Sequence, residues 1–494
     1  MSTTQVEPPA RAAGRDGEGF IARHGLWSPA QWDQADALRD EIEGRGLRFV
    51  RLGWGDQHGI VRGKTLSVPE FLRALEHGKD FQLVTALFDT TNHPVVAPFG
   101  GEGPFGVAEM AGLPDGVLVP DPSTFRVLPW VADTGWILAD AYLGSGAPCP
   151  FSTRALLRDQ LARLAAEGYS CTTGLEMEFY VTRLLDPMLS PEHSGWPPEP
   201  PRVEAIAHGF QYLTENRNDE VDGILTVIHD ALTGLGLPLR TLEDEWGPGQ
   251  CEATFGPLPA LESADSAPLI RTALKQVCRR NGYHATFMAC PALPNFFFSG
   301  WHLHQSLGAL DTGANAFTDA GGELLSPVGR AYLGGLLAHA GPASVFTTPT
   351  VTGYKRFRPD SFAPDRACWA YENRGAMLRV VGGPGAPDAR IENRIGDPAA
   401  NPYLYTASQL AAGRAGMRNG ADPGEGVGAA YLSDRPMLPR SLMEALDALR
   451  ADTLFREEFG DTFVDYILGI KDYEVGRFLA HVTDWEHREY FEVF

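Results

Sequence analysis

Pairs of glutamates recur in two short segments of this chain at spacings that would bring their carboxylates together. Glu176 and Glu178 stand two residues apart among apolar residues. Because successive side chains of a strand alternate between its faces, both glutamates would project from the same side. Glu245 and Glu252 flank a Gly-Pro-Gly turn that would carry both toward one place. Carboxylates held this close repel each other unless a cation lies between them, so all four are candidate metal ligands.

Two histidines, one more glutamate and a set of arginines extend this group. His302 and His304 are again two residues apart, and Glu392 stands in the run Arg-Ile-Glu-Asn-Arg. Taken singly, each segment has a structural alternative, because a histidine pair is often satisfied locally and an arginine run is often a solvated face. Their occurrence in one chain favours a shared pocket. The arginines concerned are Arg356, Arg374, Arg379, Arg390 and Arg394.

The types of these residues indicate which chemistry such a pocket would perform. Carboxylates with an imidazole suit Mg²⁺ or Mn²⁺ better than a structural zinc ion, which prefers thiolates. Arginines suit phosphate and carboxylate anions. Metal ions combined with arginines predict phosphoryl chemistry.

Composition excludes several classes of partner. The 63 acidic residues outnumber the 41 basic ones, which gives a formal net charge of −22. Such a surface repels nucleic acid and anionic membranes. The six cysteines form no CxxC pair and indicate reduced thiols. The N-terminal segment lacks the apolar core of a signal peptide, and no run approaches the ~18 apolar residues of a membrane span. A cytoplasmic protein is expected.

The pattern of apolar, Gly and Pro residues predicts two folded parts. Residues 1–25 are expected to be a disordered tail, because the segment is polar and rich in small residues. A Gly/Pro-rich joint at 144–150 separates a small domain, 26–145, from a large one, 146–494. Strands are predicted over 47–52 and 59–66. Helices are predicted over 31–43, 153–167, 441–450 and 471–482, and 187–201 reads as an exposed loop.

The order and wording of these segments resemble the glutamine synthetase family, type I branch, over nearly the whole chain. Supporting matches are Asp-Pro-Ser-Thr at 121–124, Leu-Pro-Trp at 128–130, Ala-Thr-Phe-Met at 285–288 and Thr-Asp-Trp-Glu at 483–486. The resemblance implies an α+β fold: a small β-grasp-like N-terminal domain and a large catalytic domain with a curved antiparallel sheet. It also implies a homododecamer of two stacked hexameric rings, with each site shared between neighbours.

The resemblance further implies a role for each matched residue. Glu178, Glu245 and Glu252 match the ligands of the metal that binds the acid substrate, and Glu176, His302 and Glu392 match the ligands of the metal that binds ATP phosphates. His304 matches the histidine near the γ-phosphate, and Arg356 matches the arginine that holds the α-carboxylate of the substrate. Arg374, Arg379 and Arg390 match the arginines on the nucleotide phosphates. Arg394 matches the arginine that supports the transferred phosphoryl group.

The chain departs from the family where the amine is expected to bind. Phe362 stands where glutamine synthetases carry a glutamate that caps the ammonium pocket and accepts a proton. Phe297 and Phe298 replace an Asn-Gly pair before Ser299 and Gly300, which makes this wall of the substrate pocket apolar; a packing change outside the pocket is the alternative. Asp89 resembles the aspartate that a neighbouring subunit contributes to the ammonium pocket, and it is then the remaining candidate base.

These departures predict the substrate. The chain is expected to be an ATP-dependent acid–amine ligase that joins L-glutamate to an organic primary amine, with apolar alkyl or aromatic amines favoured. The alternatives are a true glutamine synthetase that uses ammonia, a γ-glutamylpolyamine or γ-glutamylethanolamide synthetase, an enzyme for a different acid, and an inactive structural or regulatory homologue. The tyrosine that some type I enzymes adenylylate has no match here, so no adenylylation is expected.

Overall fold

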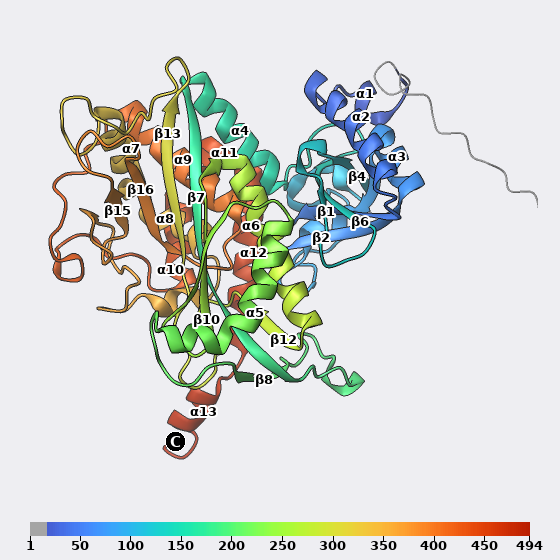
Figure 1. Ribbon diagram of the computed structural model, residues 1–494. Coiled ribbons are helices and arrows are strands. Elements are labelled where there is room, and N and C mark those ends of the chain that lie inside the picture. Colours follow the sequence, from blue (N-terminus) through green and yellow to red (C-terminus); the bar gives the residue numbers. More distant parts are fainter. Residues whose placement is uncertain (1–16) are drawn as a thin grey trace, which may run out of the picture.

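Two β-sheets, joined by a buried cluster of charged side chains, organise the chain in the computed structural model, which describes residues 17–494 (Figure 1). The smaller sheet belongs to the N-terminal part, drawn in blue, and the larger one to the rest of the chain. No helix in the described residues is long and apolar enough to cross a membrane.

The N-terminal sheet has the strand order β2-β1-β6-β4-β3, with β5 paired to β6. Its pairs are antiparallel except for β1 with β6. Helices α2 (Pro29–Gly44) and α3 (Val68–His77) belong to the same part. The strands are β1 (Phe49–Gly55), β2 (Val61–Ser67), β3 (Lys79–Gln82), β4 (Asp115–Pro120), β5 (Arg126–Val127) and β6 (Thr134–Tyr142). The predicted strands and the helix at 31–43 are thus present, and the β-grasp-like description stays a prediction.

The predicted tail is corrected at its C-terminal end. Residues 1–16 lie outside the described residues, but Phe20–Arg23 form a short helix, α1, within the segment predicted to be disordered. The reason is tertiary: Ile21 is fully buried in the core, and α1 lies against α3. Two adjacent apolar side chains, Phe20 and Ile21, in a polar segment give too weak a local pattern to predict this contact.

The large sheet is built around β7 (Tyr169–Asp186), in the order β14-β15-β16-β13-β7-β10-β9. Every pair is antiparallel except β14 with β15, which is parallel and departs from the predicted all-antiparallel sheet. Three short strands, β8, β11 and β12, also pair with β7. The bounds are β8 (Arg202–Ala205), β9 (Leu239–Asp244), β10 (Gln250–Phe255), β11 (Leu258–Pro259), β12 (Tyr283–Thr286), β13 (Trp301–Ala309), β14 (Trp369–Tyr371), β15 (Leu378–Val381) and β16 (Arg390–Gly396).

Alternation along β7 sends its apolar and its acidic side chains to opposite faces. Leu175, Met177 and Phe179 are buried against α5 (Glu215–Gly234) and α6 (Ala260–Arg280), in one hydrophobic cluster. Glu176 and Glu178, at the intervening positions, therefore face the other way. Burial of one face fixes the register of the strand, because a slip of one residue would turn the glutamates into the core.

The remaining helices surround the sheet and form the C-terminal part of the chain. The predicted helix at 153–167 forms α4 (Thr153–Ala166), capped by the Ser152 hydroxyl, which accepts from the backbone N–H of Ala155. The other helices are α7 (Pro327–Ala338), α8 (Ala340–Thr347), α9 (Pro402–Asn419), α10 (Leu442–Ala451), α11 (Leu454–Phe459), α12 (Asp461–Ala480) and α13 (Asp484–Tyr490). Helix α13, at the C-terminus, projects from the body of the molecule in Figure 1.

Arg154 of α4 joins the two sheets. Its guanidinium donates to Asp121 and Asp140 of the N-terminal part, each at 2.7 Å, and to Asp265 of α6 at 2.7 and 2.8 Å. Arg158 also donates to Asp121, at 2.7 Å. All three aspartates and Arg154 are buried. Buried charges are tolerated only when paired, so this cluster fixes the small sheet against the large one.

Candidate active site

Strand register brings residues from four segments of the sequence to the acidic face of β7. Glu178 lies directly opposite Glu252 of β10, and Glu176 lies directly opposite His302 of β13. His304, two residues further along β13, lies opposite Glu392 of β16. The four strands β10, β7, β13 and β16 therefore carry five of the six predicted metal ligands on neighbouring positions.

One end of this face forms a histidine–carboxylate group. His302 Nδ1 lies 2.6 Å from Glu176 Oε1 and 3.6 Å from Glu392 Oε1. His304 Nε2 lies 3.2 Å from the second oxygen of Glu176. Ligand atoms of Glu176, His304 and Glu392 all lie within 4.8 Å of one another. Both histidines thus reach the pair of carboxylates, and the geometry admits either as the imidazole ligand of a cation held there.

Arginines surround the buried Glu392. Arg379 donates to its Oε2 at 3.1 Å, and Arg394 donates to its Oε1. Burial by itself would raise the pKa of Glu392, but the charge of Arg394 and the neighbouring histidines hold it below the usual value. Arg390 Nε lies 3.3 Å from His304 Nδ1. This side of the pocket therefore combines an ionised carboxylate, which suits a metal ion, with cationic side chains, which suit phosphate.

The other end of the face is a group of three glutamates with an excess of negative charge. Burial, and then the charge of Glu245, raises the pKa of Glu178 to about 8. Burial likewise raises the pKa of Glu245 to about 7. The pKa of Glu252 is also raised, by burial and by the charges of Glu176 and Glu178. A divalent cation would relieve this repulsion, so the donor set fits the metal that the sequence predicts.

Backbone and amide donors fix Glu178 and Glu245. The Gly300 N–H donates to Glu178 Oε2 at 2.7 Å, and Gln250 Nε2 donates to the same oxygen at 3.3 Å. The Trp246 N–H donates to Glu245 Oε2 at 3.1 Å. Gln250 also lies 3.2 Å from the Ser299 hydroxyl and donates to the Phe298 carbonyl at 2.6 Å. The predicted substrate segment 297–300 is therefore tied directly to the carboxylates.

Arg356 lies beside this segment and is almost fully buried. Its three nitrogens donate to backbone carbonyls: Nε to Gly353 at 3.1 Å, Nη1 to Gly396 at 2.9 Å and Nη2 to Ile395 at 2.6 Å. A side chain at Gly300 would stand 3.4 Å from Nη1, so the guanidinium reaches the edge of the substrate segment. The three bonds hold it rigidly, as a residue that positions a substrate carboxylate requires.

Aromatic side chains form a continuous wall beside Glu245 and Gln250. The ring of Phe298 lies 5.1 Å from Phe297, and Phe297 lies 6.5 Å from Trp246. Tyr212 follows, 6.0 Å from Trp246. Arg358 covers the other end, 4.9 Å above the Phe298 ring. We call the four rings, Tyr212, Trp246, Phe297 and Phe298, the aromatic wall.

Three predicted residues are placed elsewhere or only loosely. Phe362 stands on a turn with φ of 61°, and 62% of it is exposed. Asp89 pairs with Arg477 at 3.0 Å and accepts from the backbone N–H groups of Thr91 and His93. Arg374 is tied to the site by its backbone carbonyl, which accepts from Arg394 Nε at 2.9 Å. The roles of these three side chains stay predictions.

Sequence reasoning missed Gln250, Trp246 and Tyr212. Gln250 was overlooked because amides carry no charge, although it lies two residues before Glu252, in the segment already singled out. Trp246 directly follows Glu245, and an exposed Trp beside a candidate ligand is a signal for a substrate contact. Tyr212 lies in a separate segment and offers no sequence signal, because only tertiary packing brings it to Trp246.

Comparison with known proteins finds relatives over nearly the whole chain. The profile described as "Glutamine synthetase, catalytic domain" matches residues 150–490. The chain is 47% identical to a γ-glutamylanilide synthase of Acinetobacter sp over 493 residues, covering 96% of this chain and 99% of that protein. It is 32% identical to a glutamate–isopropylamine ligase of Pseudomonas sp, covering 92% and 97%. A solved structure described as a GmaS/ADP complex superposes with a TM-score of 0.77 at 27% identity, covering 92% of this chain and 99% of that one.

Proposed function

The chain belongs to the glutamine synthetase family, and from that premise we propose that it joins the γ-carboxylate of L-glutamate to an apolar, preferably aromatic, primary amine. The relatives establish the general reaction: the chain is an ATP-dependent ligase that forms carbon–nitrogen bonds, of the γ-glutamyl-amine ligase type. ATP and divalent metal ions are the cofactors of the family. The identity of the amine and the steps of the reaction are the proposal.

The aromatic wall carries the proposal. The wall passes through Trp246, which directly follows Glu245, to Phe297 and Phe298. The next two residues, Ser299 and Gly300, are hydrogen-bonded to Gln250 and Glu178 respectively. Ammonia has no apolar surface and gains nothing from such a wall. An aryl or alkyl group gains free energy by leaving water, about 25 cal/mol per Å², and an aryl ring gains further from aromatic contact. The name of the 47% identical relative supports an aromatic amine.

The reaction would proceed in two steps. An oxygen of the γ-carboxylate attacks the γ-phosphorus of ATP, and ADP leaves, giving γ-glutamyl phosphate. The amine nitrogen then attacks the acyl carbon, phosphate leaves with the carbon–oxygen electron pair, and the nitrogen passes a proton to Asp89. Glu176, His302 and Glu392 would hold one metal ion and Glu178, Glu245 and Glu252 another, which supply Lewis-acid stabilisation of the charge on the phosphates and the acyl group.

The basic side chains would bind different anionic groups of the substrates. Arg379, Arg390 and Arg394 surround Glu392 and His304, and this supports a place for them and Arg374 on the ATP phosphates. Arg356, fixed by three carbonyls next to Gly300, would hold the α-carboxylate of glutamate. His304, between Glu176 and Arg390, would stand near the transferred phosphoryl group.

Asp89 would act from a neighbouring subunit of the proposed dodecamer. Burial alone would raise its pKa, but hydrogen bonds from His93 and Thr91 and the charge of Arg477 hold it below the usual value. A carboxylate with a depressed pKa is a weak proton acceptor. Asp89 would therefore take the proton only after the nitrogen has bonded to the acyl carbon, when that proton has become acidic.

Release of ADP across a panel of amines tests the proposal. The enzyme would be supplied with ATP, Mg²⁺, L-glutamate and, separately, aniline, isopropylamine, ethanolamine, putrescine or ammonia. Aniline and isopropylamine are expected to give higher kcat/KM than the other three. A higher kcat/KM for ammonia than for every organic amine would overturn the proposal and favour a true glutamine synthetase.

A further inference from the structure

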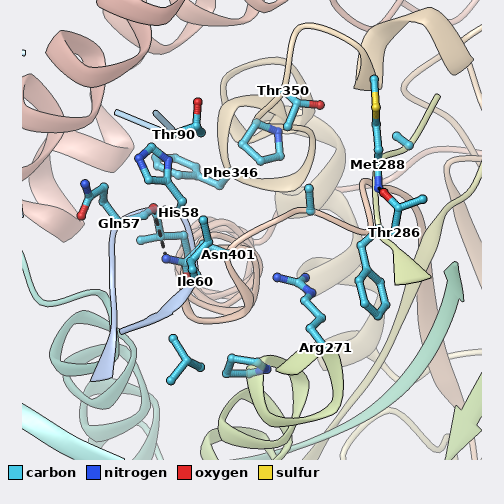
Figure 2. A pocket seen from close by; sticks show the side chains of 18 of the residues that line it. Gln57, His58, Ile60, Thr90, Arg271, Thr286, Met288, Phe346, Thr350 and Asn401 are labelled. Carbon is cyan, nitrogen blue, oxygen red and sulfur yellow. Dashed lines mark hydrogen bonds between the residues drawn. The ribbon is translucent and has the colours of Figure 1, made fainter. Parts of the chain in front are cut away.

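One pocket of the chain is lined by none of the candidate site residues. It is a cavity of about 550 Å³ where the turn between β1 and β2 meets the large domain. None of the candidate catalytic, metal-binding or substrate-binding residues lines it. Its volume is within the range of small-molecule sites, about 300–1,000 Å³. Its walls come from the β1–β2 turn, α6, the segment after β12, the end of α8, and α12 (Figure 2).

Most of the lining is apolar. Ile60 and Val61 contribute from the N-terminal side, and Phe287 and Phe346 from the large domain. Pro268, Met288, Ala289, Val345, Pro349, Leu404 and Ile467 complete this surface. A ligand for this space therefore needs an apolar body, because a wholly polar molecule would lose hydration without replacement contacts.

The charged residues of the lining are all basic. Arg271, Lys275 and Lys471 line the cavity, and no carboxylate does, although the chain as a whole carries a net charge of −22. Lys471 is paired with Glu474 at 2.8 Å, and Lys275 donates to the Ala285 carbonyl at 3.3 Å. Asp397 attracts Arg271 from outside the lining. The local field favours an anion against the overall charge of the protein.

Arg271 is the cation of the lining that has an unsatisfied N–H group. It is buried, one of its Nη atoms donates to the Ala400 carbonyl at 2.6 Å, and its Nε has no hydrogen-bond partner among the described residues. Figure 2 shows its side chain reaching from α6 toward the middle of the cavity. Nε is itself closed off from solvent, so a ligand carboxylate in the cavity would accept from the Nη atoms, in a charge-assisted hydrogen bond.

We propose that this cavity binds a small organic monoanion with an apolar body, such as an aryl-substituted carboxylate, whose carboxylate accepts from Arg271. A single buried guanidinium that makes one hydrogen bond within the protein favours a single carboxylate over a nucleotide or a polyanion, because both lysines already have partners. The site would be separate from the site for glutamate and ATP, since the two share no lining residue.

Calorimetric titration of the full-length protein with 4-phenylbutyrate tests this proposal. Saturable binding is expected, and it should persist with saturating L-glutamate, ADP and Mg²⁺, which occupy the catalytic site. The neutral amide, 4-phenylbutanamide, should bind at least ~10-fold more weakly, because it offers no charge-assisted hydrogen bond to Arg271. Absence of binding, displacement by glutamate and ADP, or equal binding of the amide would each overturn the proposal.

Three variants of α6 locate the binding. Arg271→Gln should weaken 4-phenylbutyrate by at least ~10-fold. Arg280→Gln, a charge change on the same helix outside the lining, is the matched control and should leave binding unchanged. Thr272→Phe fills the cavity without altering a charge and should abolish binding, which keeps the test decisive if Arg271→Gln fails to fold. Unchanged binding by Thr272→Phe would place the ligand elsewhere and contradict the proposal.

Discussion

Glu178 of β7 and Glu252 of β10 are direct partners across an antiparallel strand pair. Like charges at such positions destabilise a sheet. Burial is the main cause of the raised pKa values of both carboxyls, and the charges of Glu176 and Glu178 add to the rise at Glu252. A pair of this kind costs stability unless a cation neutralises it. Its presence at the centre of the large sheet is the strongest structural sign that this face is built to hold a metal ion.

Glu252→Gln should separate stability from activity. The variant keeps the shape of the side chain and removes one buried charge, so the metal-free protein should show a higher Tm than the parent. The rise in Tm on adding Mg²⁺ should shrink, and ligase activity should fall by ~100-fold or more, because a metal ligand is lost. Thermal unfolding with and without Mg²⁺, together with ADP release, measures this. A lower Tm without metal would contradict the account of Glu252 as a destabilising charge.

Arg356→Lys should fail despite keeping the charge. A lysine cannot reproduce the fork of three bonds to the carbonyls of Gly353, Ile395 and Gly396. We expect a loss of about 2–4 kcal/mol in the free energy of unfolding and a large increase in the KM for glutamate. Urea denaturation and glutamate saturation curves provide the measurement. A folded variant with an unchanged KM for glutamate would show that Arg356 does not bind this substrate.

Trp246→Ala should change the preference among amines. Trp246 is 45% exposed, so its loss should cost little stability, but it removes the centre of the aromatic wall. We expect kcat/KM for aniline to fall by ~10-fold or more, through the lost aromatic contact and buried area, with ammonia affected far less. Trp485→Ala, at an exposed Trp of α13, is the control. Equal losses for aniline and ammonia would mean that Trp246 supports the metal site rather than the amine.

Phe362→Glu should raise the use of ammonia relative to aniline, if the position of Phe362 in the family pattern places it at the amine. A carboxylate there would attract ammonium and accept its proton. Phe362 is exposed on its turn, so the substitution should leave Tm nearly unchanged. The ratio of kcat/KM for the two amines is the readout. A folded variant with an unchanged ratio would exclude Phe362 from the amine pocket.

Low pH should weaken the ion pairs of Arg154 and so lower the stability of the protein. Burial alone would raise the pKa of Asp121, but Arg154 and Arg158 hold it below its ordinary value of 3.8. A depressed carboxyl pKa contributes stability that is fully present above the unfolded value and is lost as pH falls through the folded one. Stability should therefore drop steeply below about pH 3.8 through this group. Urea unfolding at a series of pH values measures the slope.

Arg154→Met should remove that part of the acid dependence. It would also lower stability by about 3–5 kcal/mol at neutral pH, because three buried carboxylates lose a shared partner. Arg45→Met, which breaks an exposed pair with Glu41 at the end of α2, is the control and should change stability little. An unchanged acid slope in Arg154→Met would show that Asp121 is stabilised by other groups.

The sequence alone determined the local geometry of the site. Alternation along a strand places Glu176 and Glu178 on one face of their strand, because backbone geometry fixes the side-chain period at two. It places His302 and His304 on one face of another strand for the same reason. Predicted helices and strands in the folded parts were found for the same reason. Family resemblance supplied the fold and the class of reaction, which the relatives bear out.

Tertiary structure decided which of these faces meet and what surrounds them. The partnering of Glu178 with Glu252 and of Glu176 with His302 depends on strand register between distant segments, which core packing sets. The contact of Tyr212 with Trp246, the burial of Ile21 and the sharing of Arg154 among three aspartates likewise join residues far apart in the chain. Local periodicity carries no information on such contacts, because their free energy arises only when the elements pack.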